Sequence, residues 1–198
     1  MPHKPDLAAL VGSRICHDLI SPIGAIGNGV ELILLDAAVG GPEVTLIADS
    51  VSHANARIRF FRIAFGATGA DHRISRGEVA AILSDITAGS RLAISWDSPD
   101  DLLRRDVKLV FLLVLCLESA LPYGGRIGIE RSSSRWLLTG SAARLNIVPE
   151  LWACLVDPAA PADIGPAQVQ FLLVPEEIAR QHRRLTTELG ESEIRLSF

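Results

Sequence analysis

The stretch Ser13–Ile33, SRICHDLISPIGAIGNGVELI, contains the pattern that determines the fold of the first part of the chain. Its apolar residues recur at spacings of three and four, which is the spacing of one face of an α-helix. We therefore predict a long helix from Asp6 to about Asp36. The residues of this apolar face are Ile15, Leu19, Ile23, Ile26, Val30 and Ile33.

A second helix is predicted directly afterwards, because Gly40-Gly41-Pro42 combines glycines at a helix end with a proline that suits the next first turn. A lone hairpin of two such helices cannot cover both of its apolar stripes. Pairing two copies into a four-helix bundle buries them, so we expect a homodimer. The second helix should run from Pro42 to about Ala67, with the apolar residues Val44, Ile47, Val51, Ile58, Phe61 and Phe65.

The pattern changes after residues 66–72, and the rest of the chain is predicted to mix helices and strands. We expect an α+β fold with a helical hairpin over residues 1–70 and a second domain over residues 71–198. In this second domain, helices should pack on one face of a largely antiparallel sheet. The expected elements are helices at Arg76–Thr87, Asp106–Ala120 and about Ala167–Arg184, strands at Arg91–Trp96, Arg126–Arg131 and Trp136–Ser141, and two short strands on either side of Gly190.

Composition argues against several classes of function. The chain has 198 residues, 48% of them hydrophobic, and its net charge of -4 leaves no excess of Lys and Arg for binding DNA or RNA. The strongest apolar run, Leu109–Leu117, is too short to cross a bilayer, and no secretory signal is recognisable. Cys16, Cys116 and Cys154 form neither a disulfide framework nor a zinc motif. We expect a cytoplasmic protein that binds neither nucleic acid nor membrane.

His17 is the candidate for chemistry within the first helix. On an ideal helix it points roughly 165° away from the apolar face, so its imidazole should face solvent. A neutral imidazole has one ring nitrogen free to attack phosphorus, and the neighbouring Asp18 can hold the proton of the other nitrogen. An exposed histidine is more often a solvated surface residue than a nucleophile. The sequence around His17 must therefore decide between these two interpretations. From their chemistry alone, His17 and Asp18 are candidate catalytic residues.

Small side chains surround His17 on its face of the helix. Ser13, Ser21 and Gly24 lie about one or two turns from it, so another protein could approach the imidazole closely. Pro22 lacks a backbone N–H and is expected to kink the helix below this point. The predicted partner-binding residues are Ser13, Arg14, Ser21, Pro22, Gly24 and Asn28.

The order His-Asp-Leu-x-Ser-Pro-Ile, from His17 to Ile23, resembles the phosphoacceptor motif of sensor histidine kinases. The whole stretch Ser13–Ile33 is similar to the ChpT-type histidine phosphotransferases of alphaproteobacteria, and the similarity continues into the segments PAQVQFLL and LGESEIRLSF near the C-terminus. This resemblance implies a homodimer whose hairpins form a four-helix bundle. It also implies that the second domain is a degenerate α/β sandwich like the ATPase domain of a histidine kinase.

The function that the resemblance implies is a step in a multistep phosphorelay. His17 would be phosphorylated by the receiver domain of a hybrid histidine kinase and would pass the phosphoryl group to the receiver domains of response regulators. Asp18, Ser21 and Pro22 match the acidic, polar and proline positions of the family motif. A receiver supplies its own aspartate and Mg²⁺, so we expect no cofactor or metal on this chain.

Two other functions stay open at the level of sequence. An ATP-dependent histidine kinase without a sensor would need nucleotide-binding motifs. However, Leu115–Ala120 contains no asparagine, and Asp163-Ile164-Gly165-Pro166 lacks the second glycine of a DxGxG motif. A non-catalytic scaffold or inhibitor would bind kinase or regulator without phosphotransfer. The leading hypothesis is a histidine phosphotransferase that does not itself use ATP.

Overall fold

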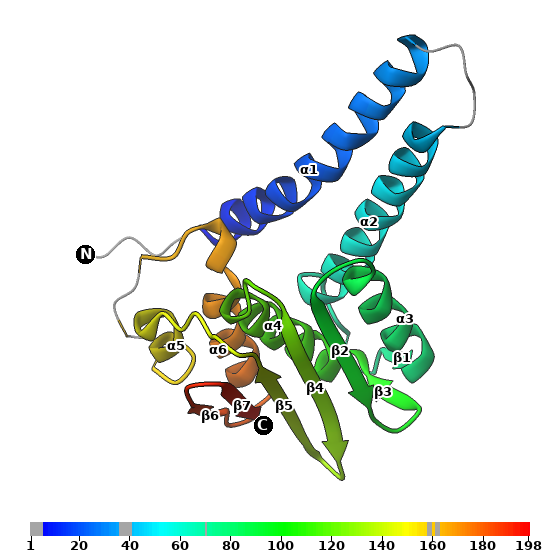
Figure 1. The fold of residues 1–198 in the computed structure, drawn as a ribbon. Helices are drawn as coiled ribbons and strands as arrows, with labels where there is room; N and C mark the ends of the chain where they lie inside the picture. The colour runs from blue at the N-terminus through cyan, green and yellow to red at the C-terminus, as the bar shows by residue number, and fades with distance from the viewer. Residues whose placement is uncertain (1–5, 36–40, 70, 158–159, 161–162) are drawn as a thin grey trace.

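The computed structural model describes residues 6–35, 41–69, 71–157, 160 and 163–198. Two long helices, α1 (Leu7–Leu35) and α2 (Pro42–Ala64), lie side by side as a hairpin that projects from the rest of the molecule (Figure 1). The remaining elements gather at the open end of this hairpin. The predicted helical hairpin is therefore confirmed.

Local sequence explains where the hairpin helices begin. The Asp6 carboxylate accepts hydrogen bonds from the backbone N–H groups of Ala8 and Ala9, each at 3.1 Å, and so caps the first turn of α1. Pro42 stands at the start of α2, after the extended residue Gly41. The other glycine of the predicted break, Gly40, lies outside the described residues.

The last turns of α2 belong to the main hydrophobic core. Phe60, Phe61 and Ala64 are buried, and the Phe60 ring stacks on Phe111 with 4.5 Å between the ring centroids. Phe111 is part of α4 (Arg104–Ala120), the most deeply buried helix of the C-terminal part. The predicted domain boundary at residue 70 therefore separates two segments that share one core.

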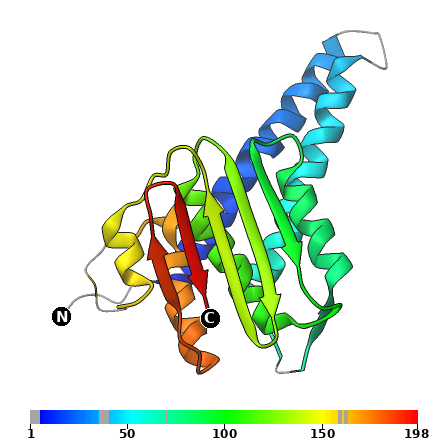
Figure 2. The same ribbon diagram turned by 60° about the horizontal axis from the view of Figure 1, so that its bottom comes forward.

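The C-terminal part is a five-stranded sheet covered by helices on one face (Figure 2). The strand order is β2-β4-β5-β7-β6, with β2 parallel to β4 and every other neighbouring pair antiparallel. The chain crosses from β2 to β4 through α4, since parallel strands need such a crossover. The strands are β2 (Leu92–Asp97), β4 (Gly125–Ser132), β5 (Arg135–Ser141), β6 (Thr186–Leu189) and β7 (Glu193–Ser197).

Alternating side chains orient the sheet toward its helices. On β4, Ile127 and Ile129 are buried, whereas Arg126 and Glu130 are exposed. The helical layer consists of α3 (Arg76–Thr87), α4, α5 (Pro149–Cys154) and α6 (Gln170–Arg180). Helices on one face of a largely antiparallel sheet are therefore confirmed. Within the described ranges, no helix is both long and apolar enough to span a membrane.

Three short elements were not predicted from the sequence. Strands β1 (Arg73–Ser75) and β3 (Asp101–Leu103) pair with each other in antiparallel orientation, and α5 precedes the segment that leads to α6. Elements of this length contain too few residues for a periodic pattern of apolar side chains. Their positions depend on tertiary contacts.

The helix expected over Ala167–Arg184 is wrong at both ends. The chain first forms a short 3-10 helix, η1 (Pro166–Gln168), and α6 then ends at Arg180. His182 has a φ of 52°, in the left-handed region, which a continuing helix does not allow. The helix expected from Pro42 to about Ala67 likewise ends earlier, at Ala64.

Candidate active site

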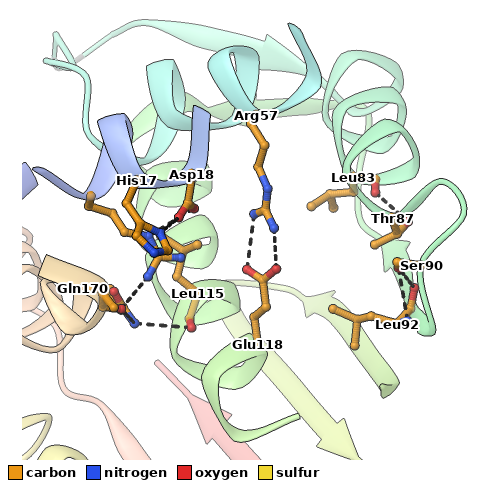
Figure 3. A network of polar contacts seen from close by, with 12 residues as sticks. His17, Asp18, Arg57, Leu83, Thr87, Ser90, Leu92, Leu115, Glu118 and Gln170 are labelled. Atoms are coloured by element: carbon orange, nitrogen blue, oxygen red, sulfur yellow. Dashed lines mark hydrogen bonds and ion pairs between the residues drawn. The ribbon is translucent and has the colours of Figure 1, made fainter. Parts of the chain in front are cut away.

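His17 lies on α1 with its imidazole open to solvent. Its side chain is 81% exposed, whereas Ile15 and Leu19 on the opposite side of the helix are half-buried. Figure 3 shows His17 beside Asp18 on the same helix. The exposure predicted from helical spacing is therefore observed.

Asp18 is held from two sides. Its Oδ1 lies 3.2 Å from His17 Nδ1, and its Oδ2 accepts a hydrogen bond of 3.1 Å from Arg14 Nε. Only 12% of the Asp18 side chain is exposed, so a fixed carboxylate stands beside an open imidazole. When Nδ1 carries the proton and donates a hydrogen bond to this carboxylate, Nε2 has a free lone pair.

Arg14 reaches from α1 to the C-terminal part of the chain. Besides its bond to Asp18, its Nη1 donates to the carbonyl oxygen of Ala167 in η1. The guanidinium thus contacts two groups of its own chain, and only 13% of the side chain is exposed. A contact of Arg14 with a partner remains a prediction.

The other predicted partner-binding residues lie on two neighbouring surfaces. Ser13, Gly24 and Asn28 are exposed, and a Cβ atom added at Gly24 would meet nothing within 4 Å. Ser21 and Pro22 instead line a groove of about 410 Å³. The helix continues through Pro22, so this proline does not end it.

The groove lies between the hairpin and the turn that joins α3 to β2. From the hairpin it is lined by residues that include Asp18, Ser21, His53 and Arg57, and from the end of α3 and the turn after it by residues 85–90 apart from Thr87. Sequence analysis did not predict this groove, because its walls come from segments far apart in the chain. It adds a surface of the C-terminal part to the surroundings of His17.

An ion pair between Arg57 and Glu118 ties α2 to α4. Arg57 Nη2 and Nη1 donate to the two carboxylate oxygens of Glu118 at 2.7 and 3.3 Å (Figure 3). Burial acts to lower the pKa of Arg57, but the charges of Glu118 and Asp18 hold that pKa above its usual value. The pair was missed from sequence because 61 positions separate the two residues.

One of the two segments compared with nucleotide motifs, Leu115–Ala120, lines a cavity together with residues that directly follow the other segment. Leu115 and Ser119 of α4, together with Ala167 and Gln168 of η1, line a cavity of about 320 Å³. Over the residues that the structure describes, no group of three or more His, Cys, Asp or Glu is placed to hold a metal ion. The expectation that this chain carries no cofactor stays a prediction.

The apolar face of α1 is divided, which corrects the prediction of one continuous face. Ile15, Leu19, Ile26 and Ile33 are half-buried, but Ile23 is 59% and Val30 is 44% exposed. On an ideal helix, Ile23 lies about 65° and Val30 about 45° from the centre of the half-buried set, so both lie at the edge of that face. The exposed stripe of the hairpin consists of Ile20, Ile23 and Val30 on α1 and Val44, Val51 and Ile58 on α2.

Comparison with known proteins places this architecture in a family. The family profile described as "Histidine phosphotransferase C-terminal domain" matches residues 76–193. The protein phosphotransferase ChpT of Brucella abortus (strain 2308) is 34% identical over 181 residues, which cover 87% of this chain and 86% of that protein. A solved structure of a bacterial phosphotransferase has a TM-score of 0.83 at 29% identity, covering 100% of this chain and 98% of that one. This chain therefore belongs to the ChpT-type histidine phosphotransferases, and its activity is protein phosphotransfer in a phosphorelay.

Proposed function

We propose that this protein shuttles a phosphoryl group through His17, from the receiver domain of a hybrid histidine kinase to the receiver domains of response regulators. The observation that carries the proposal is the contact between His17 and Asp18. His17 Nδ1 lies 3.2 Å from Asp18 Oδ1, while the rest of the ring is open to solvent. A protein-bound phosphoryl group can approach only a nucleophile that is exposed in this way.

The first step forms a bond between His17 Nε2 and the phosphorus atom of a phosphorylated receiver aspartate. The lone pair of Nε2 attacks, the bond from phosphorus to the aspartate oxygen breaks, and the receiver carboxylate leaves with that electron pair. The ring becomes positively charged, and the Asp18 carboxylate stabilises it by accepting the hydrogen bond from Nδ1. In the second step the aspartate of another receiver attacks the phosphorus, and His17 leaves as neutral imidazole.

The receivers supply the remaining groups for this chemistry. Each receiver brings its own aspartate and Mg²⁺, so this chain contributes the nucleophile and a docking surface and requires no cofactor. ATP is not a substrate in this proposal. The absence of asparagine from Leu115–Ala120 and the proline at position 166 support that part.

The receiver docks on the side of α1 that carries His17. Its first helix packs across the surface formed by Ser13, Gly24 and Asn28, where side chains are small or absent. The groove that includes Ser21 and Pro22 lies next to this surface and can accept a receiver loop. Receiver binding and phosphoryl transfer thus depend on small side chains around the imidazole.

Two copies of the chain pair through the exposed stripe of the hairpin, which gives a four-helix bundle with one His17 in each chain. The stripe contains large apolar side chains, such as Ile23 at 59% and Ile58 at 48% exposure, which water disfavours. In this arrangement the C-terminal part retains the shape of a degenerate kinase ATPase domain. Because the proposed partners are receiver domains of a relay, we expect the protein to act in the cytoplasm.

Transfer from a radiolabelled phosphoreceiver tests the proposal. The native chain should acquire an acid-labile label, and His17→Ala should acquire none while its melting temperature stays unchanged. His53→Ala is the matched control, because His53 is an exposed histidine on α2 that lines the neighbouring groove. Its labelling should equal that of the native chain.

Each alternative function has its own outcome in this experiment. A label on His17→Ala, or an acid-stable label on the native chain, means that another residue accepts the phosphoryl group. Receiver binding without any label supports a scaffold or inhibitor. Binding of ATP and Mg²⁺ in calorimetry, followed by autophosphorylation, supports a histidine kinase.

A further inference from the structure

Arg14 joins the candidate nucleophile to the C-terminal part of the chain. Its Nε donates to Asp18 Oδ2 at 3.1 Å, and its Nη1 donates to the Ala167 carbonyl. Both Arg14 and Asp18 are largely buried, with 13% and 12% of their side chains exposed. A planar guanidinium that bonds a carboxylate and a backbone carbonyl fixes the direction of both.

The Ala167 carbonyl is itself held by Gln170 of α6. Gln170 Nε2 donates to the carbonyl oxygens of Ala167 at 3.2 Å and of Leu115 in α4 at 3.5 Å. Figure 3 shows Gln170 reaching toward Leu115 on the side of α4 that faces His17. A line of contacts therefore runs from α4 through η1 to the nucleophile.

Gln170 is an unusual residue for its surroundings. It is fully buried, and its Oε1 has no hydrogen-bond partner within the described part of the chain. A buried polar atom without a partner is destabilising, so packing alone gives no reason for an amide here. The hydrogen bond that the Gln170 amide donates to the Ala167 carbonyl explains why an amide side chain stands here.

We propose that Arg14 is a positioning residue, which holds the Asp18 carboxylate where it accepts the Nδ1 proton of His17 and so makes Nε2 the attacking nitrogen. This inference rests on the proposed role of His17. Without Arg14, the Asp18 side chain can rotate and the imidazole can exchange between two tautomers, of which only one has its lone pair on Nε2. The C-terminal part thus contributes to the reactivity of a residue on the hairpin.

Phosphoryl acceptance by the full chain, measured against receiver concentration, separates positioning from docking. Arg14→Met keeps the length of the side chain and removes its donors. Its maximal rate should fall severalfold, by about tenfold at most, and the half-saturating receiver concentration should change less than about twofold. Arg14→Lys retains a charged donor and should recover part of the rate.

Arg104→Met is the matched control. It removes another guanidinium contact between the two parts of the chain, the bond of 3.1 Å from Arg104 Nη2 to the Arg62 carbonyl. Because this bond involves neither His17 nor Asp18, the maximal rate should stay at the native value. A similar loss in both variants would show that any loosening of the two parts slows transfer, and this result would overturn the specific role of Arg14.

Nitrogen NMR of the His17 ring reports the tautomer, which a merely structural tie would leave unchanged. The native ring should be protonated on Nδ1, and Arg14→Met should show a mixture of tautomers. Gln170→Leu should shift the ring in the same direction to a smaller extent, because it loosens Ala167 without touching Asp18. If Arg14→Met does not fold, the transfer rate and the His17 tautomer of Gln170→Leu test the positioning role instead.

The outcomes distinguish this inference from the proposed function. A native chain that is not labelled at His17 overturns the proposed function. A labelled His17 together with a native rate and tautomer in Arg14→Met overturns only the positioning role. A higher half-saturating concentration at an unchanged maximal rate also overturns it, because Arg14 would then contact the receiver directly.

Discussion

Helices α1 and α4 are both long and rich in apolar residues, but they use these residues in opposite ways. In α4 every residue from Leu109 to Leu117 is buried. In α1, Gly29 is the only buried residue among the described side chains, and Ile20 is 69% exposed. The same residue types thus form the core in one helix and a surface in the other.

This difference separates what holds the protein together from what it presents to partners. Burial of α4 removes apolar area from water at about 25 cal/mol per Å² and stabilises the whole C-terminal part. Several large apolar side chains of α1, among them Ile20, Ile23 and Val30, stay exposed in the single chain. We attribute their exposure to the second copy and the receiver that α1 is proposed to bind.

The largest effect is expected from truncating the buried helix. Phe111→Ala should lower the free energy of unfolding by about 3–5 kcal/mol, because the ring is fully buried and stacks on Phe60. Leu32→Ala on α1, where the side chain is 48% exposed, should change it by less than about 1 kcal/mol. Urea unfolding of both variants measures the contrast. Equal losses would contradict the division between the two helices.

The next effect concerns the exposed stripe of the hairpin. Val30→Glu should raise the dissociation constant of the proposed dimer at least about tenfold, since a charge would enter the proposed apolar seam between copies. Leu32→Glu is the control, because Leu32 is exposed to a similar extent and lies roughly 160° away around the helix. Sedimentation measures both. A Val30→Glu dimer as tight as the native one would place the seam elsewhere.

The surface beside His17 provides a third contrast, within α1 itself. Gly24→Arg should lower receiver affinity about tenfold by steric exclusion at an unchanged melting temperature, because the space around Gly24 is open. Gly29→Arg should instead destabilise the hairpin, since a Cβ there would lie 2.6 Å from Ile47 Cγ1. Calorimetric melting and receiver titration of both variants test this. Native receiver affinity in a folded Gly24→Arg protein would contradict docking at this surface.

A smaller effect is expected at Asp18. Asp18→Asn removes the charge that stabilises the phosphorylated ring but keeps His17 as the nucleophile, so transfer should slow by about tenfold or less without stopping. Single-turnover kinetics with a labelled receiver measure the rate. A native rate would remove Asp18 from the mechanism.

The smallest effect is expected where α4 meets the hairpin. Glu118→Gln weakens the ion pair with Arg57. The side chain of Arg57 is 25% exposed and that of Glu118 is 29% exposed. Partly exposed pairs contribute about 1 kcal/mol or less, so the loss in unfolding free energy should stay in that range. Urea unfolding measures it, and a loss as large as that of Phe111→Ala would mean that this pair carries the contact between the two parts.

The hairpin helices, the exposure of His17 and most of the sheet strands could be predicted from the sequence. Each is visible in a short window, because an amphipathic helix or strand repeats its apolar residues with a fixed local period. The division of the apolar face of α1 could not be predicted in the same way. Ile23 and Val30 lie at a different angle around the axis of α1 than Ile26 does. Whether a side chain at that angle is buried depends on where α2 packs, which the sequence of α1 does not specify.

The sequence by itself thus indicated the candidate nucleophile, its carboxylate neighbour and the family. Tertiary structure decided which groups hold them, since the Arg14 contact with Ala167 joins residues 153 positions apart. It also decided where the groove beside Ser21 lies, and that the helix expected over Ala167–Arg184 is a short turn followed by α6. The physical reason is range: helical periodicity depends on neighbours within a few residues, whereas contacts between distant segments depend on how the whole core packs.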